Sequence, residues 1–205
     1  MKKSAEILGE FGGLGNVHGV SFDGRNVWAA TGDKLRSLDP ETGEERRSFD
    51  VPAHAGTAFD GKHLFQIADA VIQKVDPETG AVVATIPAPG AGRDSGLAWS
   101  DGSLWVGQYR DRQIIEIDPE TGAIKRTIQA NRFVTGVTWV DGELWHGYSD
   151  GDSSGIARIE PDNGNVLESL EMPAGMMVSG LESDGANRFF AGGGESGAVR
   201  IIRRN

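Results

Sequence analysis

The sequence predicts an all-β protein, a five-bladed β-propeller, and three repeated features support this prediction. A glycine opens each of five units, an aromatic residue follows nine positions later, and an Asp-Gly pair lies between the two. The glycine and aromatic pairs are Gly19 and Trp28, Gly56 and Phe65, Gly96 and Trp105, Gly136 and Trp145, and Gly180 and Phe189. Repeats of about 40 residues that contain several short strands are typical of propellers, in which each repeat forms one blade.

Each unit contains the signals of four antiparallel strands, named a to d from the centre outwards. The Asp-Gly pair between two apolar runs, as at Asp101-Gly102, predicts a tight hairpin between strands a and b, because both turn residues must tolerate positive φ. The first three units continue with Asp-Pro-Glu-Thr-Gly at 39–43, 76–80 and 118–122, and residues 160–164 hold a diverged copy. Proline presets φ for a type I turn and glycine closes the turn in the left-handed region, so this motif joins strands c and d.

The last unit ends after its third predicted strand, residues 198–202. The missing fourth strand is available at residues 5–11, which have the spacing of outer strands such as 82–87. We therefore expect the N-terminal strand to close the ring in the last blade, which holds both termini in place. The chain is then a single domain, 1–205. Its expected blades are 17–52, 53–90, 91–131, 132–175, and 176–205 together with 4–11.

Composition agrees with one all-β domain. The 205 residues are 38% hydrophobic and include 30 glycines and 8 prolines. Residues 1–6 lack the apolar run of a signal peptide and no stretch is long enough to span a membrane, so we expect a cytoplasmic protein without a membrane partner. The absence of cysteine excludes disulfides, thiol nucleophiles and thiolate metal sites.

The formal net charge of −10 argues against nucleic acid as a partner, because phosphate contacts need clustered lysine and arginine. Many of the acids stand in the a–b and c–d turns, which alternation places on one side of the disc, here called the turn face. We expect them to act first as solubilising turn residues. Charges on outer strands such as 44–49 discourage edge pairing, so a monomer is expected.

The opposite side, here called the loop face, is formed by the d–a and b–c loops, which differ from blade to blade. Variable loops on a rigid scaffold are where function usually lies. The candidate ligand-binding residues gather there around blade 3: Arg93, Asp94, Gln108, Tyr109, Arg110, Arg112, Arg132, Phe133 and Tyr148, with Met176 and Met177 nearby. Guanidinium groups bind carboxylates in bidentate fashion, so we predict a site for a small anionic molecule or a peptide end. The alternative is that the arginines only balance nearby acids.

Histidines and acids near the central channel are the second group of candidates. The predicted acid–base groups are His18 and His54 before strand a of blades 1 and 2, His146 on strand b of blade 4, and Glu182 on strand a of blade 5. Neutral imidazoles with a carboxylate also suit a divalent metal such as zinc, iron or manganese, with His18, His54 and Asp94 as its ligands. The other interpretation is a set of hydrogen-bonded channel residues linked by buried water.

The repeated aromatic residues, among them Trp28, Trp105 and Trp145, are expected to pack between blades. The sequence contains no serine elbow and no glycine loop in the setting that binds phosphate.

Residues 134–145, continued by 156–159, resemble the fourth blade of the plant-type glutaminyl cyclases, also called glutamine cyclotransferases. Residues 17–20 with 27–32 resemble the first blade of that family. The resemblance covers all five blades, although repeat residues account for most of it, and virginiamycin B lyase-like propellers share the same style of repeat. It implies a five-bladed fold with its site at the mouth of the central channel.

The positions of the reactive groups of that family depart from its pattern. Its first-blade glutamate falls at Ala29, and its fourth-blade Asn-Glu pair falls at Thr135-Gly136. Cyclisation of an N-terminal glutamine needs a carboxylate to move protons, which alanine and glycine cannot do. We therefore expect a propeller that binds or transforms a small anionic or amide-like molecule without being an efficient glutaminyl cyclase.

Three classes of function stay open at this point. The first is an enzyme on a cyclase-like scaffold. The second is a lyase or hydrolase that uses a divalent metal held by channel histidines and carboxylates. The third is a non-catalytic propeller that binds a small molecule or a peptide end, or serves as an interaction scaffold.

Overall fold

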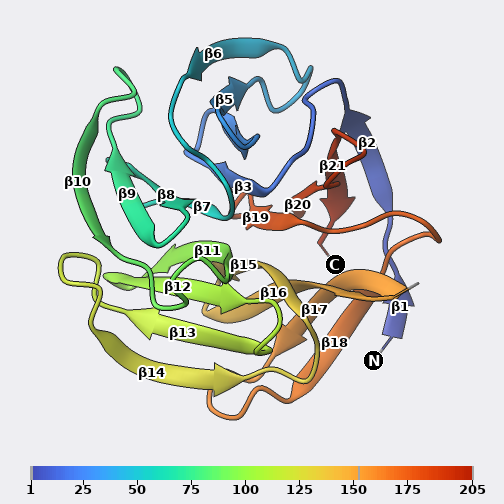
Figure 1. Cartoon of the computed structure of the whole chain (residues 1–205). Helices are drawn as coiled ribbons and strands as arrows, with labels where there is room; N and C mark the ends of the chain where they lie inside the picture. The colour runs from blue at the N-terminus through green and yellow to red at the C-terminus, as the bar shows by residue number, and fades with distance from the viewer. Residues whose placement is uncertain (1, 152, 205) are drawn as a thin grey trace.

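The computed structural model describes residues 2–151 and 153–204, whose strands form five sheets around a central axis (Figure 1). Blade 1 contains β3 (Gly19–Phe22), β4 (Val27–Ala30), β5 (Leu35–Leu38) and β6 (Glu45–Phe49). Blade 2 contains β7 (Thr57–Phe59), β8 (Leu64–Ala68), β9 (Val71–Val75) and β10 (Val82–Pro87). Blade 3 contains β11 (Asp94–Ser100), β12 (Ser103–Gln108), β13 (Gln113–Ile117) and β14 (Ile124–Gln129).

Blade 4 contains β15 (Val134–Val140), β16 (Glu143–Asp150), β17 (Ser153–Ile159) and β18 (Val166–Glu171). Blade 5 contains β19 (Gly180–Ser183), β20 (Arg188–Gly192) and β21 (Val199–Arg203). Strands a to d follow one another outwards in antiparallel order in every blade, which confirms the predicted five-bladed propeller. The described residues include no helix long and apolar enough to cross a membrane.

The N-terminal segment closes the ring as predicted. Strand β2 (Ile7–Phe11) pairs antiparallel with β21 and is the fourth strand of blade 5. Strand β1 (Lys2–Ser4) was not expected: it pairs in parallel with β18 at the outer edge of blade 4. Lys2 and Lys3 also form ion pairs of 2.8 and 2.7 Å with Glu171 and Glu168. The segment therefore joins blade 4 to blade 5 and covers the edge of blade 4.

The c–d turns follow the predicted chemistry. In blade 1, Asp39 Oδ1 accepts hydrogen bonds from the backbone N–H groups of Glu41 and Thr42, at 2.8 and 2.9 Å. These bonds lower the pKa of Asp39 to about 2. Gly43 closes the turn with φ of 73°, and the corresponding glycines of blades 2 to 4 have φ of 72–74°.

The a–b turns divide into two kinds. In blades 3 and 4 the Asp-Gly pair is the whole turn, and Asp101 and Asp141 adopt the expected positive φ of 49° and 53°. In blades 1, 2 and 5 longer turns separate the strands, and only the glycine of the pair has positive φ. The extra residues let the aspartate keep ordinary backbone angles, so the expectation of two positive φ values was wrong for these blades.

The core consists of five apolar clusters, one between each pair of neighbouring blades. The repeated aromatic residues lie in them, as predicted: Phe65 stacks on Trp99 with ring centroids 5.8 Å apart, and Trp105 lies 4.9 Å from Trp139. Such pairs add to the free energy gained by burying their area.

The glycine that opens each repeat is needed because the five inner strands approach one another closely at the central axis. Gly19, Gly56, Gly96, Gly136 and Gly180 form a glycine ring in which each faces the backbone of the next strand a. A Cβ at any of them would approach a backbone atom of that strand to 2.8 Å or less. The ring has no room for a water molecule, so it separates the two ends of the channel.

Candidate functional site

The loop face carries a hollow of about 280 Å³ above the glycine ring. Four predicted site residues lie together in its wall: His18, His54, Asp94 and Tyr109. Met177, which is 52% exposed, also contributes to the wall. All five blades contribute to the lining of the hollow, which therefore lies at the channel mouth.

The repeat itself supplies another part of the wall. The residue directly before each ring glycine lines the hollow: His18, Ala55, Ser95, Thr135 and Ser179. Sequence reasoning missed the three hydroxyl residues of this set and also Ser149. The small-residue-then-glycine step was the available signal, because a position that repeats next to the axis presents five side chains to one point.

His18 and His54 bring two imidazoles to the same wall. Burial, together with repulsion from His54, lowers the pKa of His18 below its usual value. His54 lies within 2.9 Å of the Asp69 carboxylate through Nδ1, on the b–c turn of blade 2. His18 is thus a neutral imidazole at pH 7, which can donate one hydrogen bond and accept another.

Asp94 is the only carboxylate among the lining residues that the structure describes. It is 8% exposed, its oxygens accept the N–H of Gly90 at 2.9 and 3.0 Å, and Oδ1 also accepts Gln108 Nε2 at 3.1 Å. Burial raises the pKa of Asp94. Gln108 therefore acts behind the wall by fixing Asp94.

Tyr109 lines the hollow, and the other aromatic residues and the arginines of blades 3 and 4 stand beside it. Tyr109 stacks on Phe133 with centroids 4.8 Å apart, and its hydroxyl donates to Ser149 O at 3.3 Å. The guanidinium of Arg112 lies 4.2 Å from the Phe133 ring, and that of Arg132 lies 4.0 Å from the Tyr148 ring. These cation–π contacts place both charges against protein rings, outside the lining of the hollow.

The remaining arginines also lie outside the lining. Arg93 donates from Nε to Gly90 O at 3.2 Å and pairs with Asp111 at 3.4 Å. Arg110 is exposed in the turn after β12. No arginine or lysine belongs to the described lining, so the hollow has no cation for an anionic ligand.

His146 is completely buried on β16 and does not reach the hollow. Its Nδ1 lies 2.9 Å from Gly147 O, which fits a proton on that nitrogen, and Nε2 has no hydrogen-bond partner among the described residues. Burial lowers the pKa of His146 to about 4. The ring is thus neutral at pH 7 and is held inside blade 4.

Glu182 lies on the other side of the glycine ring, two residues beyond Gly180 on β19. Its carboxylate accepts a short hydrogen bond from Thr138 Oγ1 and one of 2.8 Å from Ser183 N. The residue is partly accessible, but its carboxyl group is enclosed by protein atoms, and this burial raises its pKa to about 7. The structure therefore does not bring Glu182 together with His18 and His54.

The described side chains do not form a metal site. Within residues 2–151 and 153–204, no three histidine, cysteine or acidic side chains converge on a point that could hold a metal ion. Of the suggested ligands, Asp94 is already occupied by Gly90 and Gln108, which leaves the two imidazoles.

Fold and site together define a five-bladed β-propeller with a hollow of mixed apolar and polar lining at the loop-face end of a closed channel. A family model described as outer membrane protein assembly factor BamB matches residues 68–204, and the chain belongs to this family. No curated protein matches the chain.

Solved structures agree on the architecture. Glutaminyl cyclase from Myxococcus xanthus superposes with a TM-score of 0.82 at 16% identity, over 98% of this chain and 97% of that one. The Cps50 (Swd1) propeller domain of Myceliophteria thermophila gives 0.59 at 12% identity, over 98% and 100%. The RRP9 WD40 repeats give 0.60 at 10% identity, over 98% of each chain. The glutaminyl-cyclase-like propeller inferred from the repeats is confirmed as a fold, and identities this low carry no activity with them.

Proposed function

We propose that the loop-face hollow binds a small amide-like molecule and that the chain does not efficiently cyclise N-terminal glutamine. The observation that carries the proposal is the lining itself: two imidazoles and several hydroxyls, with one carboxylate and no cation. An amide presents one carbonyl acceptor and N–H donors, which match the neutral imidazole of His18 and hydroxyl groups. The hollow's volume of about 280 Å³ suits a molecule of this size.

An anionic ligand is the weaker form of the same proposal. It would lie beside Asp94, while the nearest arginines are held against Phe133 and Tyr148. Burying a second negative charge there without a cation would cost free energy. The amide-like ligand avoids this cost.

Calorimetric titration with a glutaminyl peptide amide tests the binding. We expect His18→Ala and His54→Ala each to weaken binding by about tenfold, the loss of one hydrogen bond to a polar ligand. His63→Ala is the matched control, because His63 lies at the turn face beside Asp60. Unchanged affinity in both loop-face variants would contradict the proposal.

Ammonia release from the same peptide tests the chemistry. We expect no turnover above the buffer rate, because Ala29, Thr135 and Gly136 cannot transfer protons. Turnover that is abolished by changing a loop-face residue such as His18 would overturn this part.

A second candidate function is a non-catalytic interaction propeller, and family membership favours it. The family is described by an assembly factor, and such a role would use the same face to hold a peptide end. If the protein binds a glutaminyl peptide much more tightly than a small amide-like molecule without the peptide, this candidate is supported. The cytoplasmic location and the monomeric state stay predictions of the sequence.

A further inference from the structure

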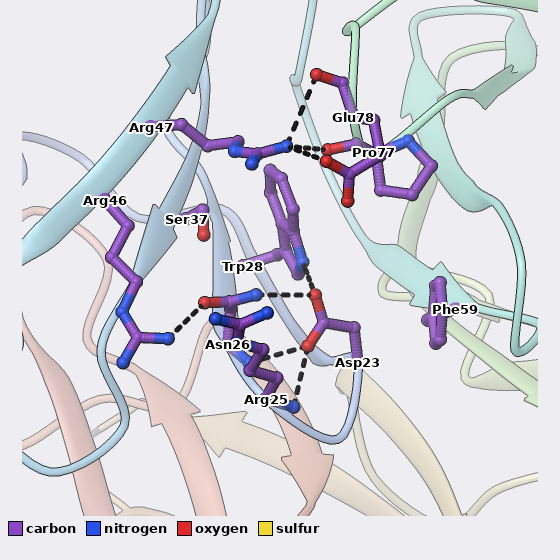
Figure 2. Close-up of a pocket in the computed structure, with 10 residues that line it drawn as sticks. All are labelled: Asp23, Arg25, Asn26, Trp28, Ser37, Arg46, Arg47, Phe59, Pro77 and Glu78. Atoms are coloured by element: carbon purple, nitrogen blue, oxygen red, sulfur yellow. Dashed lines mark hydrogen bonds and ion pairs between the residues drawn. The ribbon is translucent and has the colours of Figure 1, made fainter.

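A second hollow, of about 370 Å³, opens between blades 1 and 2. It lies on the turn face, on the opposite side of the disc from the loop-face hollow. Figure 2 shows Ser37 and Trp28 at its back, with Arg46 and Arg47 on one side and Pro77 and Glu78 of blade 2 on the other. Ser37 is 1% exposed. We call it the blade 1 hollow.

Strand pairing shows why blade 1 is hollow at this point. The residue of strand c that faces the aromatic residue of strand b is Ser37 in blade 1, Lys74 in blade 2, Glu116 in blade 3, Arg158 in blade 4 and Ile202 in blade 5. Only blade 1 has a small side chain there. The hollow is the volume that a long side chain fills in the other blades.

Blade 3 shows what chemistry this volume accepts. Glu116 points its carboxylate into the equivalent space, where Oε2 accepts Arg126 Nε at 2.8 Å and Oε1 accepts Ser103 Oγ at 2.7 Å. Lys125 donates to Ser103 Oγ at 2.9 Å. The guanidinium of Arg126 also lies 4.8 Å from the Trp105 ring. One carboxylate therefore completes a polar cluster over the tryptophan.

Blade 1 has the same surroundings without the carboxylate. Arg47 pairs with Ser37 as Arg126 pairs with Glu116, and Arg46, like Lys125, is the additional residue of a β-bulge. Asn26 stands where blade 3 has Ser103, one residue before strand b. Arg46 is already bound to Asp39 and to Asn26 Oδ1, and Asn26 Nδ2 donates to Asp23 Oδ2 at 3.0 Å. Arg47 is therefore the residue of this set that can take the role of Arg126.

The nitrogen that would bind the missing carboxylate is free. Arg47 uses only Nη1, for Pro77 O at 2.8 Å and for Glu78 O and Oε2. Its Nε, which corresponds to the nitrogen that binds Glu116 in blade 3, has no partner among the described residues, nor has the guanidinium of Arg25. Asp23 does not compete for these cations, because its oxygens already accept four N–H groups.

We propose that the blade 1 hollow is a binding site for a short aliphatic carboxylate, whose carboxyl group takes the place that Glu116 has in blade 3. Arg47 Nε receives the carboxylate, Arg25 adds positive charge, and Trp28, Phe59 and Pro77 contact the aliphatic part, while Arg46 stays paired with Asp39. A free acid and the glutamate side chain of a peptide share this chemistry.

Propionate is the probe, because it reproduces the glutamate side chain beyond Cβ. The indole N–H of Trp28 reports on binding, since it donates to Asp23 Oδ2 at 2.7 Å at the hollow. We expect propionate to shift this NMR signal in a saturable way and the uncharged isostere propionamide to leave it unchanged. Equal shifts with inorganic phosphate would overturn the carboxylate assignment.

Variants locate the site. Ser37→Glu should abolish the propionate shift, because it restores the side chain of blade 3. Arg47→Gln should weaken binding by about tenfold, whereas Arg126→Gln, the matched control in blade 3, should change it by less than about twofold. A Trp28 shift that survives in Ser37→Glu would contradict the proposal.

The reciprocal variant tests the blade 3 comparison. Glu116→Ser should create a second propionate site, seen as a new saturable shift of the Trp105 indole signal, and absence of that shift would contradict the comparison. N-acetylglutamate N-methylamide separates the two sources of ligand: tighter binding than propionate identifies a peptide glutamate, and weaker binding identifies a free acid. Failure of all carboxylates to shift Trp28 overturns the site and leaves the loop-face hollow unaffected.

Discussion

The turn face repeats the same contacts in blade after blade, whereas the loop face carries a different loop in each blade. On the turn face a cation of one blade reaches an acid in the c–d turn of the next, in the pairs Arg47–Glu78, Lys74–Glu120, Arg126–Asp162 and Arg188–Glu41. On the loop face the side chains before the ring glycines vary from histidine to alanine, serine and threonine and meet at one hollow. The repeated ion pairs of the turn face join neighbouring blades, whereas the varied side chains of the loop face form the candidate site.

The comparison also changes how the charge is understood. The acids of the turns were expected to be solubilising residues, and the structure shows that several also receive a cation from the neighbouring blade. Most of these pairs are exposed, so each contributes little to the free energy of unfolding. The exception on this face is the strand c position opposite the strand b aromatic residue, where Ser37 leaves a hollow and the other blades have a long side chain.

The glycine ring keeps the two faces apart, and its loss should have the largest effect. In Gly136→Ala the new Cβ would lie 2.5 Å from Leu181 N, so the blades must move apart, at a cost of about 3 kcal/mol of unfolding free energy or more. Denaturant unfolding measures this. Gly12→Ala is the matched control, since no atom lies within 4 Å of a Cβ there. Equal stability of the two variants would contradict the closed ring.

Glu182 lies on the turn-face side of the glycine ring, and its raised pKa predicts a pH dependence of stability that can be measured. Between its usual value of 4.5 and about 7, the unfolded chain releases this proton while the folded chain keeps it. The unfolding free energy therefore falls as pH rises through this window, by at most about 3 kcal/mol. Glu182→Gln should remove this pH dependence and stabilise the protein at pH 8, as thermal unfolding would show. An unchanged pH profile would contradict the enclosed carboxyl group.

His146 should contribute the opposite slope over a pH window that largely overlaps that of Glu182. Its pKa is about 4 in the folded chain against 6.5 ordinarily, so between these values the unfolded chain takes up a proton that the folded chain refuses. The unfolding free energy falls as pH decreases through this window, by about 2 kcal/mol after allowance for local opening. Because the two contributions oppose each other between about pH 4.5 and 6.5, His146→Asn, which keeps a donor for Gly147 O, should make the unfolding free energy fall more steeply as pH rises through this window. A pH profile identical to that of the unchanged protein would contradict the buried neutral imidazole.

The loop-face histidines should hardly affect stability. His54 is largely exposed, and its pairing with Asp69 is a surface contact, so His54→Ala should change the unfolding free energy by less than about 0.5 kcal/mol. Denaturant unfolding alongside the binding titration checks this. A loss of several kcal/mol would mean that the wall of the hollow is structural.

The repeat made the fold predictable from sequence, because turn motifs and apolar alternation recur with one period. Ring closure followed from counting strands, whereas β1 was missed because three residues carry no periodic signal. The site was only partly predictable. His18, His54 and Asp94 meet because each stands one or two residues before its ring glycine, but alternation alone did not show that the ring closes between them and Glu182. That closure depends on how near five strands approach the axis.

A heteronuclear NMR titration of the protein with a glutaminyl peptide amide tests the central claim most directly, because it reports on both faces in one experiment. We predict saturable shifts at His18, His54 and Tyr109, with the Trp28 indole signal of the turn face unchanged. Shifts confined to the turn face, or none at the three loop-face residues, would contradict it.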